Sequence, residues 1–145
     1  SPNMLIMLGQ SGVSDKVKLE RVALNMMDSK LPDNDGYIPN EEPINIETPA
    51  ALFTNIPIKS LRADIEEQGI SVKISNSCGL YVCNRLYYEA LMLCKKYHMK
   101  SIFIHLPFYE GQPPAKPDKP TMPLNDMVKA IQTIIEKIND KYREF

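Results

Sequence analysis

Cysteine and histidine are scarce in this chain, which has three cysteines, two histidines and no tryptophan among 145 residues. An odd number of cysteines without a regular spacing argues against a disulfide scaffold. The chain also lacks a Cys-x-x-Cys motif and a pair of histidines spaced to bind zinc. We therefore expect that the protein works without a metal or another cofactor.

Long apolar runs and an excess of one charge are also absent. No apolar stretch approaches the roughly 20 residues that cross a membrane, and the net charge of −1 gives no sign of nucleic-acid or anionic-membrane binding. Gly9-Gln10-Ser11-Gly12 lacks the Gly-x-Ser-x-Gly elbow of serine hydrolases and the lysine of a phosphate loop. Residues 1–3 lead into an apolar strand instead of a signal peptide, so we expect a cytoplasmic protein.

Strand and helix patterns alternate after residue 50. The apolar spacing predicts strands at 50–54, 70–74 and 101–106, and helices at 57–68, from 79 or 80 to 97, and at 124–142. This alternation predicts an α/β fold with a mostly parallel central sheet. We expect residues 1–145 to form a single domain without internal repeats.

The first part of the chain is less regular. Residues 4–8 form a continuous apolar run, which is typical of a central strand buried on both faces. A strand is predicted at 17–26, whereas the polar residues 27–49 and the proline-rich residues 107–123 are predicted as loops. Because a domain rarely begins on a central strand, we expect an N-terminally truncated domain from a longer protein.

The stretch 75–84, Ser-Asn-Ser-Cys-Gly-Leu-Tyr-Val-Cys-Asn, places Cys83 near the start of the second predicted helix. Unpaired N–H groups and the helix dipole at that end favour a thiolate, so Cys83 is a candidate nucleophile. Free cysteines are most often small buried hydrophobic residues, and local sequence leaves that alternative open. Cys94 fits it well because it shares a helical stripe with Tyr87, and Cys78 lies in the preceding loop.

The two histidines differ in their surroundings. His105 ends the apolar strand 101–106, and sites in α/β sheets form at the carboxyl ends of strands. A cysteine at a helix start and a histidine at a strand end are the two halves of a Cys/His pair. The alternative for His105 is a core histidine bonded to a carbonyl. His98 lies in the basic segment 95–100 and is predicted to cap a helix in solvent.

Four segments, taken together, resemble a known family. Leu-Glu-Arg-Val-Ala-Leu-Asn at 19–25 resembles its glutamate motif, and Asp-Ser-Lys-Leu-Pro-Asp-Asn-Asp-Gly at 28–36 resembles its Pro-Asp-Asn turn. Residues 75–84 resemble its cysteine motif, and Phe-Ile-His-Leu-Pro at 103–107 resembles its histidine motif. The family is pyroglutamyl peptidase I, also called pyrrolidone carboxyl peptidase. The resemblance runs nearly from end to end and covers the C-terminal two-thirds of the family's length.

The resemblance implies a cysteine peptidase that removes N-terminal pyroglutamate from peptides. By that resemblance Cys83 is the nucleophile, His105 is the base and Glu20 orients His105. Read without the family, Glu20 is a solvated charge, because residues 16–24 alternate between polar and apolar as a half-exposed strand does.

The resemblance also implies a substrate pocket and an architecture. It assigns the Gln10 backbone, Leu31 and Val82 to the pyroglutamyl pocket, and it places Lys30 where the family usually has an oxyanion-stabilising arginine. Lysine keeps the charge but loses the planar fork of arginine. The implied fold is a three-layer α/β/α sandwich, and the implied assembly is a homo-oligomer, often a tetramer.

One family feature has no counterpart in these residues. The N-terminal part of the family includes a Gly-Phe-x-Pro-Phe-Gly loop whose phenylalanines pack against the pyroglutamyl ring, and no such motif occurs here. This difference leaves a second function open, namely a catalytically impaired remnant that acts as a binding or assembly module.

Overall fold

Three helices and eight strands follow one another along the chain in a computed structural model that describes residues 2–113 and 118–141. Their order is β1 (Met4–Gln10), β2 (Val17–Glu20), β3 (Val22–Leu24), β4 (Ala51–Phe53), α1 (Ile58–Glu66), β5 (Val72–Ser75), α2 (Val82–Tyr97), β6 (Lys100–Leu106), β7 (Phe108–Tyr109), β8 (Thr121–Met122) and α3 (Leu124–Lys141). None of these helices is long and apolar enough to cross a membrane.

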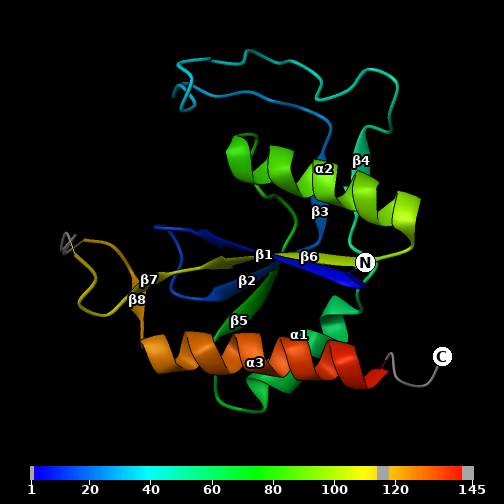
Figure 1. Cartoon of the computed structure of the whole chain (residues 1–145). Helices are drawn as coiled ribbons and strands as arrows, with labels where there is room; N and C mark the ends of the chain where they lie inside the picture. The colour runs from blue at the N-terminus through cyan, green and yellow to red at the C-terminus, as the bar shows by residue number, and fades with distance from the viewer. Residues whose placement is uncertain (1, 114–117, 142–145) are drawn as a thin grey trace. The chain divides into compact units, whose positions relative to one another are not determined.

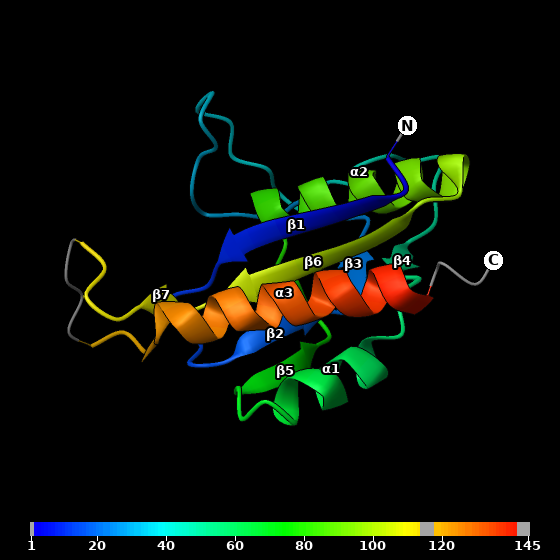
Figure 2. The ribbon, with the colours of Figure 1, turned by 60° about the horizontal axis from the view of Figure 1, so that its bottom comes forward.

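The main sheet has four strands in the order β1-β6-β2-β5. Figure 2 shows β1 and β6 running in the same direction, whereas β2 pairs antiparallel with β6. The sheet is therefore mixed, and its combination with three helices confirms the predicted α/β class. Two further pairs, β3 with β4 and β7 with β8, form small separate sheets.

The chain divides into two compact units. The first unit comprises Ser1–Met7, Glu20–Asn55 and Ser75–Phe103, and the second comprises Leu8–Leu19, Ile56–Ile74 and Ile104–Phe145. The four strands of the main sheet, β1, β2, β5 and β6, each contain residues of both units. Cys83 and Glu20 thus belong to the first unit, and His105 belongs to the second.

In the first unit, α2 packs against the antiparallel pair β3–β4, as Figure 1 shows. Tyrosines, a leucine and a cysteine recur along one side of α2, so this side is apolar enough to be buried. The core there consists of Ala23, Cys78, Tyr87, Tyr88, Leu91 and Phe103, with Cys83 packed against it.

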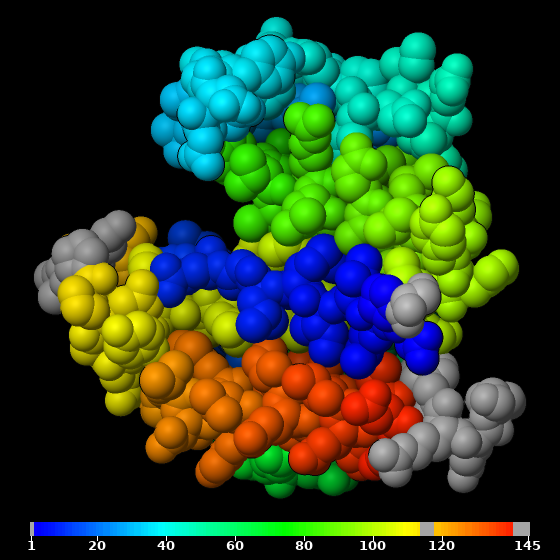
Figure 3. All heavy atoms as spheres, viewed as in Figure 1, coloured from blue at the N-terminus to red at the C-terminus, as the bar shows by residue number. Residues whose placement is uncertain are grey.

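Residues 27–49 contain neither helix nor strand, which confirms the predicted loop, and hydrogen bonds within the segment order it. Met27 and Glu42 form an antiparallel bridge. At the tip, Asp33 Oδ1 accepts hydrogen bonds from the N–H groups of Asp35 and Tyr37, both at 2.9 Å. Figure 3 shows this segment, in light blue and cyan, lying over α2, in green.

In the second unit, α1 and α3 lie side by side. Leu61 and Ile65 on α1 and Ile134 and Ile138 on α3 are buried, so the apolar stripe predicted for the last helix supplies core residues, and α1 supplies others. The Gln68 side chain donates a 2.6 Å hydrogen bond to Thr133 Oγ1. The predicted last residue of the final helix, 142, lies outside the described residues.

One strand prediction is wrong in detail. The single strand predicted at 17–26 is two strands, because the Arg21 N–H donates to Ser75 O at 2.8 Å and the Arg21 carbonyl accepts from the Thr54 N–H at 3.0 Å. The strand β1 stands at one end of the strand order of these residues, and its residues 4–7 are half-buried. The expectation of an N-terminally truncated domain allows for this position, so the central place expected for β1 in a longer protein stays a prediction.

Candidate active site

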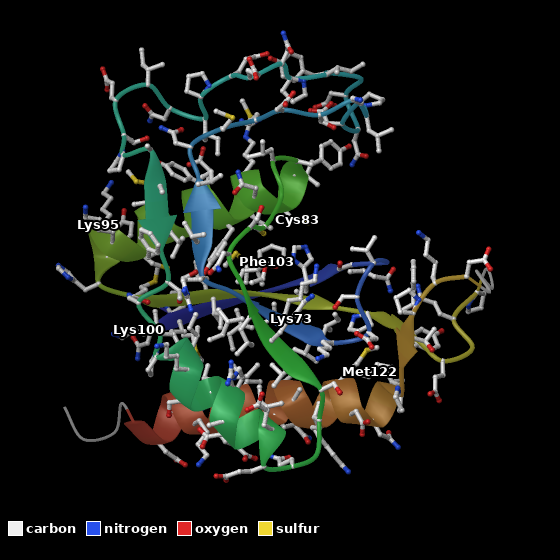
Figure 4. All side chains as sticks on the ribbon, turned by 180° about the vertical axis from the view of Figure 1, so that it is seen from behind. Lys73, Cys83, Lys95, Lys100, Phe103 and Met122 are labelled. Carbon is white, nitrogen blue, oxygen red and sulfur yellow. The ribbon has the colours of Figure 1, made fainter. Side chains whose placement is uncertain are left out.

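Cys83 is the second residue of α2, as the sequence predicts. Tyr81 at the N-cap has extended backbone and makes no side-chain capping bond, and the first turn contains no acidic residue. The thiol therefore lies at the positive end of the helix dipole. A carboxylate in the same turn would weaken this positive field, and the first turn of α2 has none. Figure 4 shows Cys83 at this end of α2.

The other two cysteines are buried, with 7% of Cys78 and 1% of Cys94 exposed. Burial raises the pKa of the Cys94 thiol, although a hydrogen bond with Ser101 opposes the rise. The Cys94 thiol also lies 3.6 Å from the Lys100 carbonyl, to which it donates. Cys94 thus fits the expected role of a packing residue, and Cys83 is the partly exposed thiol of the three.

We expect iodoacetamide to modify Cys83 faster than Cys78 and Cys94 in the folded chain near neutral pH. The reason is access together with ionisation, because a buried thiol is shielded from the reagent and resists deprotonation. Peptide mapping after short exposures measures the three rates separately. Equal rates in the folded chain, with faster and equal rates in the unfolded chain, would contradict the prediction.

Glu20 is the last residue of β2 and is completely buried. The strand pattern alone predicted that Glu20 is a solvated charge, and its burial shows that this prediction is wrong. The Glu20 carbonyl accepts a 3.0 Å hydrogen bond from the Tyr87 hydroxyl of α2. Within the first unit, the residue proposed to orient the base is thus held to the helix that carries Cys83.

His105 is the last residue but one of β6, and 8% of it is exposed. In the second unit its Cα partner across the antiparallel pair is Lys18 of β2. Glu20 follows Lys18 by two residues, and side chains two positions apart in a strand point to the same face. His98, in contrast, is the exposed C-cap of α2 with a φ of 55°, which agrees with its predicted capping role.

Gln10 ends β1 in the second unit. Its side-chain amide exchanges two hydrogen bonds with the side chain of Gln112, at 2.7 and 3.1 Å. The N–H of the next residue, Ser11, donates to the Leu106 carbonyl at 2.8 Å. The backbone that the family resemblance assigns to the substrate therefore runs beside the residue that follows His105.

Lys30 and Leu31 lie in the first unit, exposed on the loop that precedes the Pro-Asp-Asn turn. The loop is tied to the start of α2 on both sides of them. The Asp28 N–H donates to the Leu80 carbonyl at 3.0 Å, and the Tyr81 hydroxyl donates to the Pro32 carbonyl at 2.5 Å. The structure thus brings Lys30 and Leu31 to the helix end that carries Cys83.

Val82, the residue before Cys83, is half-exposed and lines a hollow of about 30 Å³ between that loop and α2. Its other lining residues are Met27, Asp33, Tyr37, Pro39, Leu80, Tyr81 and Arg85. This volume holds about one water molecule. We therefore do not identify this hollow with the pyroglutamyl pocket.

Sequence reasoning did not find two residues of α2 that connect the site to the core. The buried Asn84 side chain accepts from the Leu24 N–H and donates to the Leu24 carbonyl, both at 2.9 Å, and donates to the Met26 carbonyl at 3.1 Å. The bond from Tyr87 to Glu20 is the second connection. Asn84 directly follows the candidate nucleophile, and this position in the sequence could have drawn attention to it. The partner of Tyr87 could not be found from the sequence, because Glu20 lies 67 positions away.

The fold and these side chains define a class, an α/β protein with the residue types of a cysteine hydrolase: a thiol at a helix start, a buried histidine and a buried carboxylate. Comparison with known proteins gives the family. The family model described as pyroglutamyl peptidase matches residues 1–141.

Known proteins agree with this match. Pyrrolidone-carboxylate peptidase 1 of Caldanaerobacter subterraneus subsp. tengcongensis is 41% identical over 140 residues, which cover 95% of this chain and 69% of that protein. The pyrrolidone-carboxylate peptidase of Thermoanaerobacter sp. is 40% identical over 144 residues, 98% of this chain and 71% of that protein. The structure of pyrrolidone carboxyl peptidase from Thermococcus litoralis has a TM-score of 0.90 and 33% identity, over 99% of this chain and 68% of that one. The chain belongs to the pyroglutamyl peptidase family.

Proposed function

We propose that this chain is a cysteine peptidase that removes N-terminal pyroglutamate from peptides through an acyl-enzyme. The observation that carries the proposal is the family match over residues 1–141, which includes a partly exposed Cys83 at the start of α2. Cys83 is the nucleophile, His105 carries the proton, and Glu20 orients His105.

The reaction has two stages. The Cys83 thiol passes its proton to His105 while Sγ attacks the carbonyl of the pyroglutamyl–peptide bond. His105 then gives this proton to the leaving amine as the C–N bond breaks, which leaves a thioester on Cys83. A water molecule attacks the thioester with His105 again accepting a proton, and pyroglutamate is released as the proton returns to the thiolate.

The oxyanion of each tetrahedral intermediate needs donors. The N–H of Cys83, in the first turn of α2, is one candidate because such groups have no partner within the helix. The ammonium group of Lys30 is the second, since its loop is tied to the start of α2. The Gln10 backbone, Leu31 and Val82 form the remaining proposed contacts to the lactam.

The function is tested with a chromogenic pyroglutamyl anilide. We expect anilide release and, after acid quenching, a pyroglutamyl group on the peptide that contains Cys83. The matched control is the open-chain glutaminyl anilide, which lacks the lactam ring and should not be cleaved. Saturable binding of a pyroglutamyl peptide without any release would overturn the peptidase and favour the alternative, a binding module.

We also propose that the protein is cytoplasmic and acts as a homo-oligomer, with a tetramer as the family resemblance implies. Support for association comes from an apolar groove of about 290 Å³ in the second unit, lined mainly by Leu8, Leu106, Leu124, Met127, Val128 and Ile131. Apolar surface of this kind favours association. Light scattering across a concentration series tests the assembly, and a monomer at every concentration would contradict it.

A further inference from the structure

Tyr87 lies one turn after Cys83 on α2, at the i+4 position, so the two side chains share a face of the helix. The residue is completely buried and belongs to the core of the first unit. Packing in the apolar stripe of α2 explains why the Tyr87 ring is buried. Packing does not explain the hydroxyl, because a buried O–H group needs a hydrogen-bond partner.

The partners of this hydroxyl are backbone and side-chain groups of three other segments. It donates to the Glu20 carbonyl at the end of β2, at 3.0 Å. Burial raises the pKa of Tyr87 well above its ordinary value, while hydrogen bonds with the Thr54 side chain and the Phe103 backbone oppose this rise. The hydroxyl therefore stays protonated and can donate near neutral pH.

Two of these segments carry residues of the proposed mechanism. Glu20 is bonded directly, and Phe103 precedes His105 by two residues in β6. The Tyr87 ring also packs against the Phe103 ring, with centroids 5.7 Å apart and planes at 53°. Within the first unit, Tyr87 thus contacts Glu20 and Phe103 from the helix that carries Cys83.

We propose that Tyr87 is a positioning residue, whose hydroxyl fixes the backbone of Glu20 relative to the helix that carries Cys83. The inference rests on the proposed peptidase function. A displacement of about 1 Å in a catalytic group can cost on the order of 100-fold in rate, so a bond that holds the Glu20 backbone has a direct kinetic consequence.

The neighbouring residue Tyr88 provides a matched control. It is also buried on α2, with 1% exposed, and its hydroxyl donates to the Pro49 carbonyl at 2.5 Å and lies 2.8 Å from Thr48 Oγ1. Tyr88→Phe and Tyr87→Phe therefore remove the same atom from adjacent positions of one helix, from a part-buried bond in Tyr88 and a buried bond in Tyr87. They differ in that residues 48 and 49 contain no proposed catalytic group.

The test compares both variants with the original 145-residue chain in thermal unfolding, in turnover of a pyroglutamyl anilide and in Cys83 alkylation by iodoacetamide. Both variants should lower the melting temperature, because each removes a hydrogen bond, and Tyr87→Phe should lower it more because it takes this donor from a buried carbonyl. Only Tyr87→Phe should lower kcat, by about 10-fold, with KM changed by less than about 2-fold. Tyr87→Phe should also slow Cys83 alkylation at neutral pH, since a displaced Glu20 orients the base less well.

Equal kcat values for the two variants at equal stability would overturn the proposal and leave Tyr87 a packing residue. A fall in kcat for both variants in proportion to their loss of stability would overturn it as well. The alkylation rate keeps this test separate from the proposed function. If the original chain does not cleave the substrate, the peptidase proposal fails, yet slower alkylation in Tyr87→Phe alone still supports the positioning role.

Discussion

Replacing Cys83 with serine is expected to lower the turnover of a pyroglutamyl anilide by at least roughly 1,000-fold, which corresponds to about 4 kcal/mol of the barrier. Serine keeps the size and position of the side chain. Its hydroxyl, however, is far less acidic than a thiol, so the helix end and His105 cannot supply a comparable nucleophile. Steady-state release of the anilide measures the change, and melting temperature shows whether the fold is retained.

The control for this variant is Cys94→Ala on the same helix. Cys94 is buried and hydrogen-bonded to the Lys100 carbonyl, so its loss should reduce stability by about 1 kcal/mol while kcat stays within about 2-fold. A Cys83→Ser variant that retains more than a tenth of the original kcat would show that another group performs the attack. Cys78→Ala would then identify whether the second thiol is that group.

The helices of this chain could be predicted from its sequence because each contains a clear apolar stripe. The helix of Cys83 was expected to begin at residue 79 or 80 and begins at Val82, and the last helix was expected at residue 124 and begins there. The position of Cys83 at a helix start was therefore available from the sequence, and with it the chemical reason to single out this cysteine.

The burial of Glu20 could not be predicted in the same way. Alternating polar and apolar residues place Glu20 on the polar face of a strand, and that pattern usually means solvent. In the structure Glu20 is completely buried, and its carbonyl is bonded to a tyrosine 67 positions away. Local patterns carry no information about such distant partners, so the family resemblance was the only guide to this residue.

The segment 27–49 is a loop, as its prolines, glycine and polar residues predict. The composition of the segment does not say what orders it. The order arises instead from single side chains, such as Asp33, whose carboxylate accepts from two N–H groups of its own turn, and Asn25, which exchanges hydrogen bonds with Asn45. A turn held by one side chain can be recognised in the sequence where its partners lie within a few residues, as for Asp33. The pair of Asn25 and Asn45 is 20 positions apart and cannot be recognised in this way.

Replacing His105 with alanine is expected to lower turnover by roughly 100- to 10,000-fold, because general acid–base catalysis commonly contributes a factor of this size. His105 accepts the thiol proton, donates to the leaving amine and activates water, so its loss affects both stages of the reaction. Since His105 is 8% exposed, alanine also leaves a cavity, and His105→Gln should be measured beside it to keep the volume. Both variants should retain alkylation selectivity for Cys83 over Cys94, because the burial of Cys94 does not depend on His105, but with a lower absolute rate at neutral pH.

The second histidine gives the control for this prediction. His98 is an exposed C-cap with a φ of 55°, a conformation that asparagine adopts more readily than alanine, so His98→Asn removes the imidazole with little strain. We expect its kcat to stay within about 2-fold of the original, since His98 lies at the opposite end of α2 from Cys83. A loss of turnover in His98→Asn that equals the loss in His105→Gln would contradict the assignment of the base, because an effect common to both histidines would then reflect stability and not proton transfer.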